Sequence, residues 1–403
     1  MIKNLFPSKI FLGIQGIALF CFFFEKELAA IFAGDLDDFS AHISSGNRGI
    51  VVATIFILIT YIILRQVKTL NPQKYKIILP KKVLVLSLGV ETISIFKMLL
   101  FGEYGEGARE ALYSGQLSLG VLKLNTPILY MLVMLFFGKQ GQKNEKTNLE
   151  DALICGYIFL LFFLKDFVFG SRGSFLNVLT FSMAGLTFFQ KFKIFTLKNI
   201  VRFGFVIFLG FFYLTSIRSS KICSMSDIYS SIMIKFSANL AVATNFINKD
   251  LYVTNKFDAQ KGTTWYLVKP LYETPAFEID EIQYFSTINI IRGLRRIIID
   301  QSNQGINKAT TYFFNIYGEY PFNSASYLFK VLLFGKYSAI VLGTTLVGLI
   351  LYGRSSPHAC FFAYTTITYF AMLSFTANAL LEVPFCIMPF FSFIFKRNVI
   401  VAN

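Results

Sequence analysis

The chain has 403 residues, of which 55% are hydrophobic and only 15% are charged, and its formal net charge is +15. Charged residues usually make up about a quarter of a soluble domain, so this composition excludes an ordinary soluble protein and indicates an integral membrane protein. The basic residues gather at the ends of apolar segments rather than in one patch, which argues against a nucleic-acid-binding surface.

Ten apolar segments approach the length of about 20 residues that a membrane-spanning helix needs. In chain order we expect them at residues 10–33, 49–64, 83–101, 119–137, 152–169, 174–190, 200–217, 327–351, 358–376 and 382–395. Helices are expected because backbone groups in lipid must be satisfied within the segment. The sequence therefore predicts an all-α polytopic membrane protein with about ten transmembrane helices.

The connecting segments alternate in charge, which predicts the orientation of the chain. Seventeen Lys or Arg residues fall in the two termini and in loops 65–82, 138–151, 190–199 and 352–357, against three in the short loops on the other side. By the positive-inside rule both termini are cytoplasmic. The first apolar segment lacks a small-residue cleavage site before an aqueous domain, so we expect a span rather than a signal peptide.

This arrangement divides the chain into three parts: residues 1–217 with spans one to seven, residues 218–326 as a large outer loop, and residues 327–403 with spans eight to ten and the tail. Structureless loops of that length are rare and usually functional. Two parts of the loop, 228–247 and 282–299, could enter the membrane, which would raise the count to twelve. No internal repeat is evident, which weakens a transporter interpretation.

Cysteine and histidine residues are too few and too scattered to indicate a metal centre. Five cysteines occur without a Cys-x-x-Cys motif, and the two histidines, His42 and His358, are far apart in the sequence. We therefore expect no disulfide framework, no bound metal and no Ser–His pair.

Arginines at the outer face are the main candidate site residues. Arg172 lies in the turn GSRGSFL, Arg218 lies at the end of span seven, and Arg292, Arg295 and Arg296 share one face of a helix at 289–300. Such a set could clamp a phosphate or pyrophosphate, which arginine binds with two parallel hydrogen bonds. The alternatives are an anchor that snorkels to the interface for Arg172 and an amphipathic helix on anionic headgroups for the cluster. Two lysines, Lys97 and Lys165, are further contributors to the clamp.

A segment rich in tyrosine and asparagine, NKATTYFFNIYGEYPFNS (307–324), precedes span eight. Aromatic rings and amides suit sugar binding, and from this segment we select Asn307, Tyr312 and Tyr317 as glycan contacts. The alternative is an interfacial aromatic belt.

Three motifs together resemble the O-antigen polymerases, the oligosaccharide repeat-unit polymerases also called Wzy: GSRGSFL (170–176), SIRSS (216–220) and the stretch from Asn307 to Tyr320. The resemblance covers nearly the whole chain in topology. Two features depart from the family: the five candidate arginines do not fit its paired Arg-x10-Gly pattern, and Tyr317-Gly318-Glu319-Tyr320 stands where the family has Tyr-Asp-Phe-Gly.

The resemblance implies a fold similar to the C-type glycosyltransferases and a periplasmic reaction at the bacterial inner membrane. An undecaprenyl-pyrophosphate-linked glycan would be transferred to another lipid-linked repeat unit, with no cofactor and with a separate co-polymerase controlling chain length. The arginines would stabilise the leaving pyrophosphate. A carboxylate would take the proton of the attacking hydroxyl, and our candidates are Glu319 and Asp300, with Glu273 behind them. We expect Glu91, within span three, to be paired inside the bundle rather than catalytic.

Three other functions stay open. The pair Asp35 and Asp37 in the first outer loop could hold a divalent metal, as in C-type glycosyltransferases that use lipid-monophosphate sugars. An O-antigen ligase would need a histidine in the large loop, which has none. A lipid-linked oligosaccharide flippase would place its charges in a central cavity rather than at one face.

Overall fold

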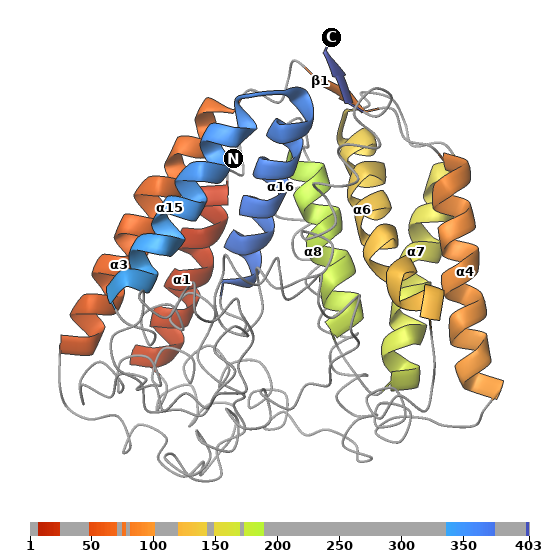
Figure 1. The fold of residues 1–403 in the computed structure, drawn as a ribbon. Helices are drawn as coiled ribbons and strands as arrows, with labels where there is room; N and C mark the ends of the chain where they lie inside the picture. Colours follow the sequence, from red (N-terminus) through yellow and green to blue (C-terminus); the bar gives the residue numbers. More distant parts are fainter. Residues whose placement is uncertain are drawn as a thin grey trace, which may run out of the picture.

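The computed structural model describes residues 7–24, 48–70, 75–77, 81–100, 120–142, 149–169, 173–188, 336–374 and 400–402. This part is almost entirely helical, and Figure 1 shows its long helices running side by side. The helices are α1 (Pro7–Phe23), α3 (Arg48–Arg65), α4 (Lys81–Leu100), α6 (Gly120–Gln142), α7 (Leu149–Phe169), α8 (Gly173–Phe188), α15 (Lys336–Gly353) and α16 (Pro357–Leu373), with the short 3-10 helix η2 (Gln66–Thr69) and the strands β1 (Tyr75–Ile77) and β2 (Ile400–Ala402).

The helices of the described residues fall on apolar segments that the sequence predicts as spans, so the all-α fold is confirmed for this part of the chain. One helical stretch, Ile50–Thr69, is long and apolar enough by itself to cross a membrane, and four apolar helical stretches are shorter. The expected spans at 200–217 and 382–395, and the loop at 218–326, lie outside the described residues.

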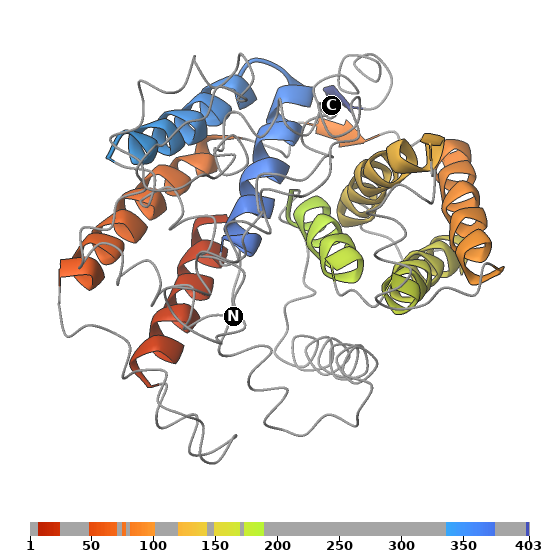
Figure 2. The same ribbon diagram turned by 60° about the horizontal axis from the view of Figure 1, so that its bottom comes forward.

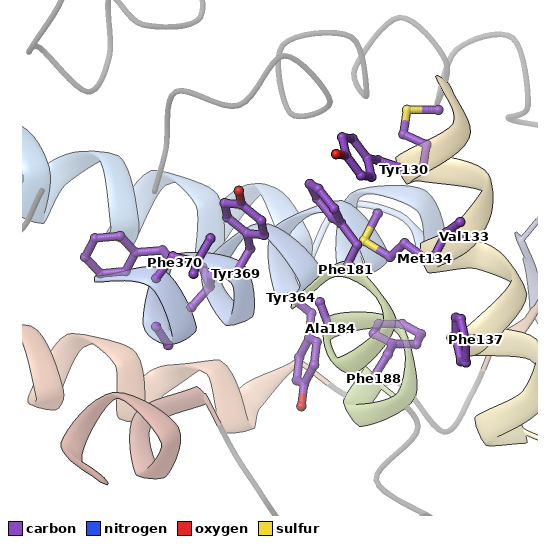
Figure 3. Packing of buried hydrophobic residues seen from close by; sticks show 14 of the residues in the cluster. Tyr130, Val133, Met134, Phe137, Phe181, Ala184, Phe188, Tyr364, Tyr369 and Phe370 are labelled. Carbon is purple, nitrogen blue, oxygen red and sulfur yellow. The ribbon is translucent and has the colours of Figure 1, made fainter. Parts of the chain in front are cut away.

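Seen from below, the helices form two groups (Figure 2). One group contains α1, α3, α15 and α16, and the other contains α4, α6, α7 and α8. The contact between α8 and α16 joins the two groups. Aromatic rings cross this contact in a continuous column. Tyr130 of α6 stacks between Phe162 of α7 and Phe181 of α8, at 5.1 and 4.9 Å between centroids. Phe181 in turn stacks on Tyr369 of α16 at 4.7 Å, and Figure 3 shows Tyr130, Phe181 and Tyr369.

Glycines allow α6 and α8 to approach unusually closely. A Cβ atom on Gly185 of α8 would lie 2.2 Å from the carbonyl oxygen of Met134, and one on Gly141 of α6 would lie 3.0 Å from that of Leu186. Small residues at such contacts are typical of helices that associate within membranes, where close backbone approach replaces the hydrophobic driving force. This pair forms the centre of the second group of helices.

Long-range contacts gather at one end of the bundle, which we call the ribbon end. There β1 pairs with β2 in antiparallel register, with Tyr75 opposite Ala402 (Figure 1). Arg354, in the turn between α15 and α16, donates from Nη2 to Thr69 Oγ1 at 2.9 Å. Lys81 forms ion pairs with Glu150 at 3.0 Å and with Asp151 at 2.8 Å. Segments that the sequence predicts on the basic side of the membrane therefore meet at the ribbon end.

Helix starts are fixed by identifiable side chains. Ser356 caps α16 by accepting a hydrogen bond from Ala359 N at 3.2 Å, and Pro357 follows at the first helical position, where its missing N–H costs nothing. The first turn of α7 contains Glu150 and Asp151, whose charges suit the positive end of the helix dipole. Within the helices, hydroxyls such as those of Ser182 and Thr368 donate to carbonyls four residues earlier, which satisfies them in apolar surroundings.

Candidate functional site

The site residues that the sequence predicts in the outer loops lie outside the described residues. These are Arg172, Arg218, Arg292, Arg295, Arg296, Asp300, Asn307, Tyr312, Tyr317 and Glu319, and with them Asp35, Asp37 and Glu273. Their predicted roles stay predictions. Arg172 directly precedes Gly173, the first residue of α8, so the described part of the chain begins again at the next residue.

Inside the described bundle, the charged and polar side chains of α4, α6 and α7 converge on Glu91. The Glu91 carboxylate is 2% exposed. It accepts hydrogen bonds from Asn125 Nδ2 at 2.9 Å and from Thr126 Oγ1 at 2.9 Å, and it forms an ion pair with Lys165. The prediction that Glu91 is paired within the bundle is confirmed.

Further contacts extend this network to Ser87 of α4 and to Phe162 of α7. Ser87 donates to Asn125 Oδ1 at 2.8 Å, and Asn125 donates to the Ser87 carbonyl at 3.0 Å. Lys165 Nζ also donates to Thr126 Oγ1 at 3.0 Å and lies 5.9 Å from the centre of the Phe162 ring. Because an unpaired charge inside apolar helices is costly, these contacts explain how both ions are accommodated.

The residue after Lys165 serves a different helix. Asp166 is fully buried, and its two oxygens accept from the amides of Ser174, at 3.0 Å, and Phe175, at 2.7 Å. These amides belong to the first turn of α8, which has no partner of its own for them. Asp166 therefore caps α8 from the last turn of α7 and fixes the two helix ends that flank the segment 170–172.

Lys165 and Asp166 lie at the end of the bundle opposite the ribbon end, which we call the α7–α8 end (Figure 1). Lys165 is four residues before Phe169, the last residue of α7, which places it about 6 Å along the axis from that end at 1.5 Å per residue. The lysine side chain is 16% exposed, in contrast to its acidic partner. Lys97, also predicted as a contributor, is exposed in the last turn of α4.

A second lysine–acid pair lies at the ribbon end, and it differs in its surroundings. The Lys81 side chain is 31% exposed, while Asp151 is fully buried. Hydrogen bonds to Asp151 and then to Glu150 raise the pKa of Lys81 above its ordinary value. This pair joins the start of α4 to the start of α7, and the Glu91–Lys165 pair joins the same two helices toward the α7–α8 end.

Sequence reasoning missed Ser87, Asn125, Thr126 and Asp166. A usable signal existed for Asn125 and Thr126, because two polar residues directly before Pro127 interrupt a segment that is otherwise apolar. Counting residues from the ends of the predicted spans also places Asn125 and Lys165 in the outer halves of their helices and Glu91 near the middle of span three. The capping role of Asp166 had no comparable signal, since the cap acts on another helix.

Within the described ranges, no group of three or more His, Cys, Asp or Glu side chains could hold a metal ion. Comparisons of the chain with protein-family models, with curated proteins and with solved structures found no match.

Proposed function

We propose that the chain is a glycosyltransferase of the bacterial inner membrane that polymerises undecaprenyl-pyrophosphate-linked oligosaccharide repeat units at the periplasmic face. The product would be an O-antigen, a capsule or an exopolysaccharide. The proposal combines about ten membrane spans, a large outer loop and basic residues at the outer face. Its support comes from the surface of the bundle, from the α7–α8 end and from the resemblance of the loop motifs to the repeat-unit polymerases.

Exposed apolar side chains support a membrane location. On α4, Leu86, Ile93 and Phe96 are exposed, and α3 exposes Ile55, Ile59 and Ile62. Large exposed apolar patches are uncommon on soluble monomers, and a helix bundle in lipid presents them along its outer faces. Acidic and basic side chains such as Glu91, Lys165 and Asp166 instead point into the bundle, where each has partners.

The observation that carries the proposal is the anchoring at the α7–α8 end. Asp166 holds the first amides of α8, and the preceding residue of α7, Lys165, has a positively charged, partly exposed side chain. The predicted pyrophosphate contact Arg172 is joined directly to α8 at Gly173. A polymerase needs positive groups held in place where its lipid pyrophosphate leaves, because preorganised charge is worth more than mobile charge.

The reaction would proceed by direct displacement. A hydroxyl of the acceptor sugar attacks the anomeric carbon of the donor glycan, and the bond from that carbon to the pyrophosphate oxygen breaks. Arg172, Arg218 and the cluster Arg292, Arg295 and Arg296 would receive the released undecaprenyl pyrophosphate. Glu319 or Asp300 would take the hydroxyl proton, which typically contributes about 10²–10⁴ in rate.

The test is the surface polysaccharide of cells in which the gene is deleted and then restored as wild type or as Arg172→Ala. We expect the deletion to leave a single repeat unit on the acceptor in place of a ladder of chain lengths, and Arg172→Ala to restore the ladder poorly, by about 10²–10³ in rate. Arg65→Ala is the matched control, because Arg65 is an exposed arginine toward the ribbon end. It should restore the full ladder.

Other outcomes would replace the proposal. Loss of every repeat unit in the deletion strain would indicate a ligase or a flippase. A ladder that persists in the deletion strain would exclude a polymerase. Loss of activity in the presence of a chelator, reversed by a divalent metal, would favour the C-type glycosyltransferase with Asp35 and Asp37.

A further inference from the structure

The ammonium of Lys165 has a position and a bonding state that suit an anionic ligand. Its described acceptors are Glu91 and Thr126, which take two of its three protons. Lysine carries three donors and no acceptor, so within the described part of the chain one proton is left for another partner. Among the charged members of the network, Lys165 is 16% exposed and Glu91 is 2% exposed. The Lys165 side chain is therefore the more exposed of the two charged side chains of the network.

The anion site that a helix start would ordinarily offer is already filled here. The first amides of α8 donate to Asp166, so a phosphate approaching this end would meet a carboxylate rather than free N–H groups. Asp166 directs both oxygens at α8. Lys165, on the neighbouring position of α7, is turned toward α4 and α6 instead. Asp166 therefore binds the start of α8, and Lys165 is the charged residue of this pair that could bind a phosphate.

Thr126 and Asn125 hold the ion pair of Lys165 and Glu91 in place. Thr126 bridges both ions, since its hydroxyl is 2.9 Å from Glu91 Oε1 and 3.0 Å from Lys165 Nζ. Asn125 fixes the other carboxylate oxygen at 2.9 Å. A lysine side chain loses rotamer freedom when it binds a ligand, and a lysine already fixed in place loses less of it.

We propose that Lys165 is a phosphate contact at the α7–α8 end, held in place by Glu91 and Thr126, and that it binds the phosphate group of an anionic polyprenyl lipid. The identification of that lipid as the pyrophosphate-linked substrate rests on the proposed function. The binding of a polyprenyl phosphate group at Lys165 is a separate claim and is tested separately.

The test measures binding of farnesyl pyrophosphate to the purified full chain in nanodiscs made of uncharged lipid. Two variants are compared, Glu91→Gln and the double variant Glu91→Gln/Lys165→Met, which differ only in the ammonium. The double variant replaces the buried ion pair by uncharged side chains of similar size, a change that proteins often tolerate. We expect the double variant to bind about ten- to a hundredfold more weakly, the range for a charge-assisted hydrogen bond.

Lys81→Met is the matched control, because Lys81 also pairs with a buried acid but lies at the ribbon end. It should bind farnesyl pyrophosphate as the wild type does. Binding by the wild type should also weaken with rising salt, and the double variant should lose most of this dependence. Lys165→Arg, which keeps the charge, should retain binding.

Equal affinity of the double variant and Glu91→Gln would overturn the proposal. Weaker binding by Lys81→Met to the same extent would also overturn it, since the effect would then be non-specific. Inorganic pyrophosphate distinguishes the source of the ligand: binding of farnesyl pyrophosphate alone supports a lipid, and equal binding of both contradicts it. If the deletion strain keeps its ladder while Lys165 still governs binding, the polymerase proposal fails and the phosphate contact stands.

Discussion

At the scale of single residues, two neighbouring side chains of α7 connect this helix to different partner helices. Lys165 contacts α4 and α6, and Asp166 contacts α8. Because both are charged and lie among apolar helices, each depends on its partners to remain in the bundle. We therefore expect substitutions that keep the size of these side chains but change their hydrogen bonding to lower the stability of the bundle.

Replacing Asp166 by Asn should destabilise the bundle by about 1–2 kcal/mol, the usual value of a helix cap. Asparagine has one acceptor oxygen, so one of the two amides that Asp166 now accepts from loses its partner. The apparent unfolding temperature in detergent measures the effect. Ser174→Ala is the control, since it removes a side chain and keeps the amide that Asp166 binds. A melting temperature for Asp166→Asn equal to that of the wild type would contradict the capping role.

Replacing Gly185 by Leu should also destabilise the protein, by about 1–3 kcal/mol, the usual cost of overpacking. Its Cβ would lie 2.2 Å from the Met134 carbonyl oxygen, and backbone cannot move aside as a flexible side chain can. Gly156→Leu on α7 is the matched control, because a Cβ there meets nothing within 4 Å. Thermal unfolding of the two purified variants compares them directly, and equal melting temperatures would refute the close contact of α6 and α8.

At the scale of whole elements, the aromatic column joins the two groups of helices. Phe181 is fully buried between Tyr130 and Tyr369. Phe181→Ala should therefore cost about 3–5 kcal/mol, the range for a buried aromatic side chain. Phe96→Ala, which removes a ring exposed on α4, should cost less than about 0.5 kcal/mol. Both are measured as shifts of the unfolding temperature in detergent, and similar shifts would show that the column does not join the groups.

The sequence allowed the helices to be predicted, because long apolar segments indicate helices in lipid whatever they contact. It did not allow their partners to be predicted. The ion pair of Glu91 and Lys165 joins residues 74 positions apart, and nothing local to either residue specifies the other. The pairing of Tyr75–Ile77 with Ile400–Ala402 could not be predicted either, because a strand of three residues shows too little alternation of apolar and polar residues to be recognised in the sequence.

At the scale of the whole molecule, the distribution of charge separates the two ends of the bundle. Among the described residues, basic side chains of the predicted cytoplasmic loops lie at the ribbon end, where Arg354 binds Thr69 and Lys81 binds Asp151. Of the predicted substrate contacts, Lys165 lies at the α7–α8 end. By the positive-inside rule we expect the ribbon end to face the cytoplasm and the α7–α8 end, with Lys165, to face the periplasm. A lipid-linked glycan could be used there only if this orientation holds.

Single cysteines introduced into a cysteine-free variant test the orientation. Gly173→Cys marks the α7–α8 end, where a Cβ meets nothing within 4 Å, and Ser355→Cys marks the exposed turn between α15 and α16. A maleimide that cannot cross the inner membrane should label Gly173→Cys from the periplasm and leave Ser355→Cys unlabelled. Inverted membrane vesicles should give the reverse pattern. Labelling of both cysteines from one side would contradict the membrane-spanning bundle. A reversed pattern would place Lys165 and Arg172 toward the cytoplasm, where a periplasmic polymerase could not use them.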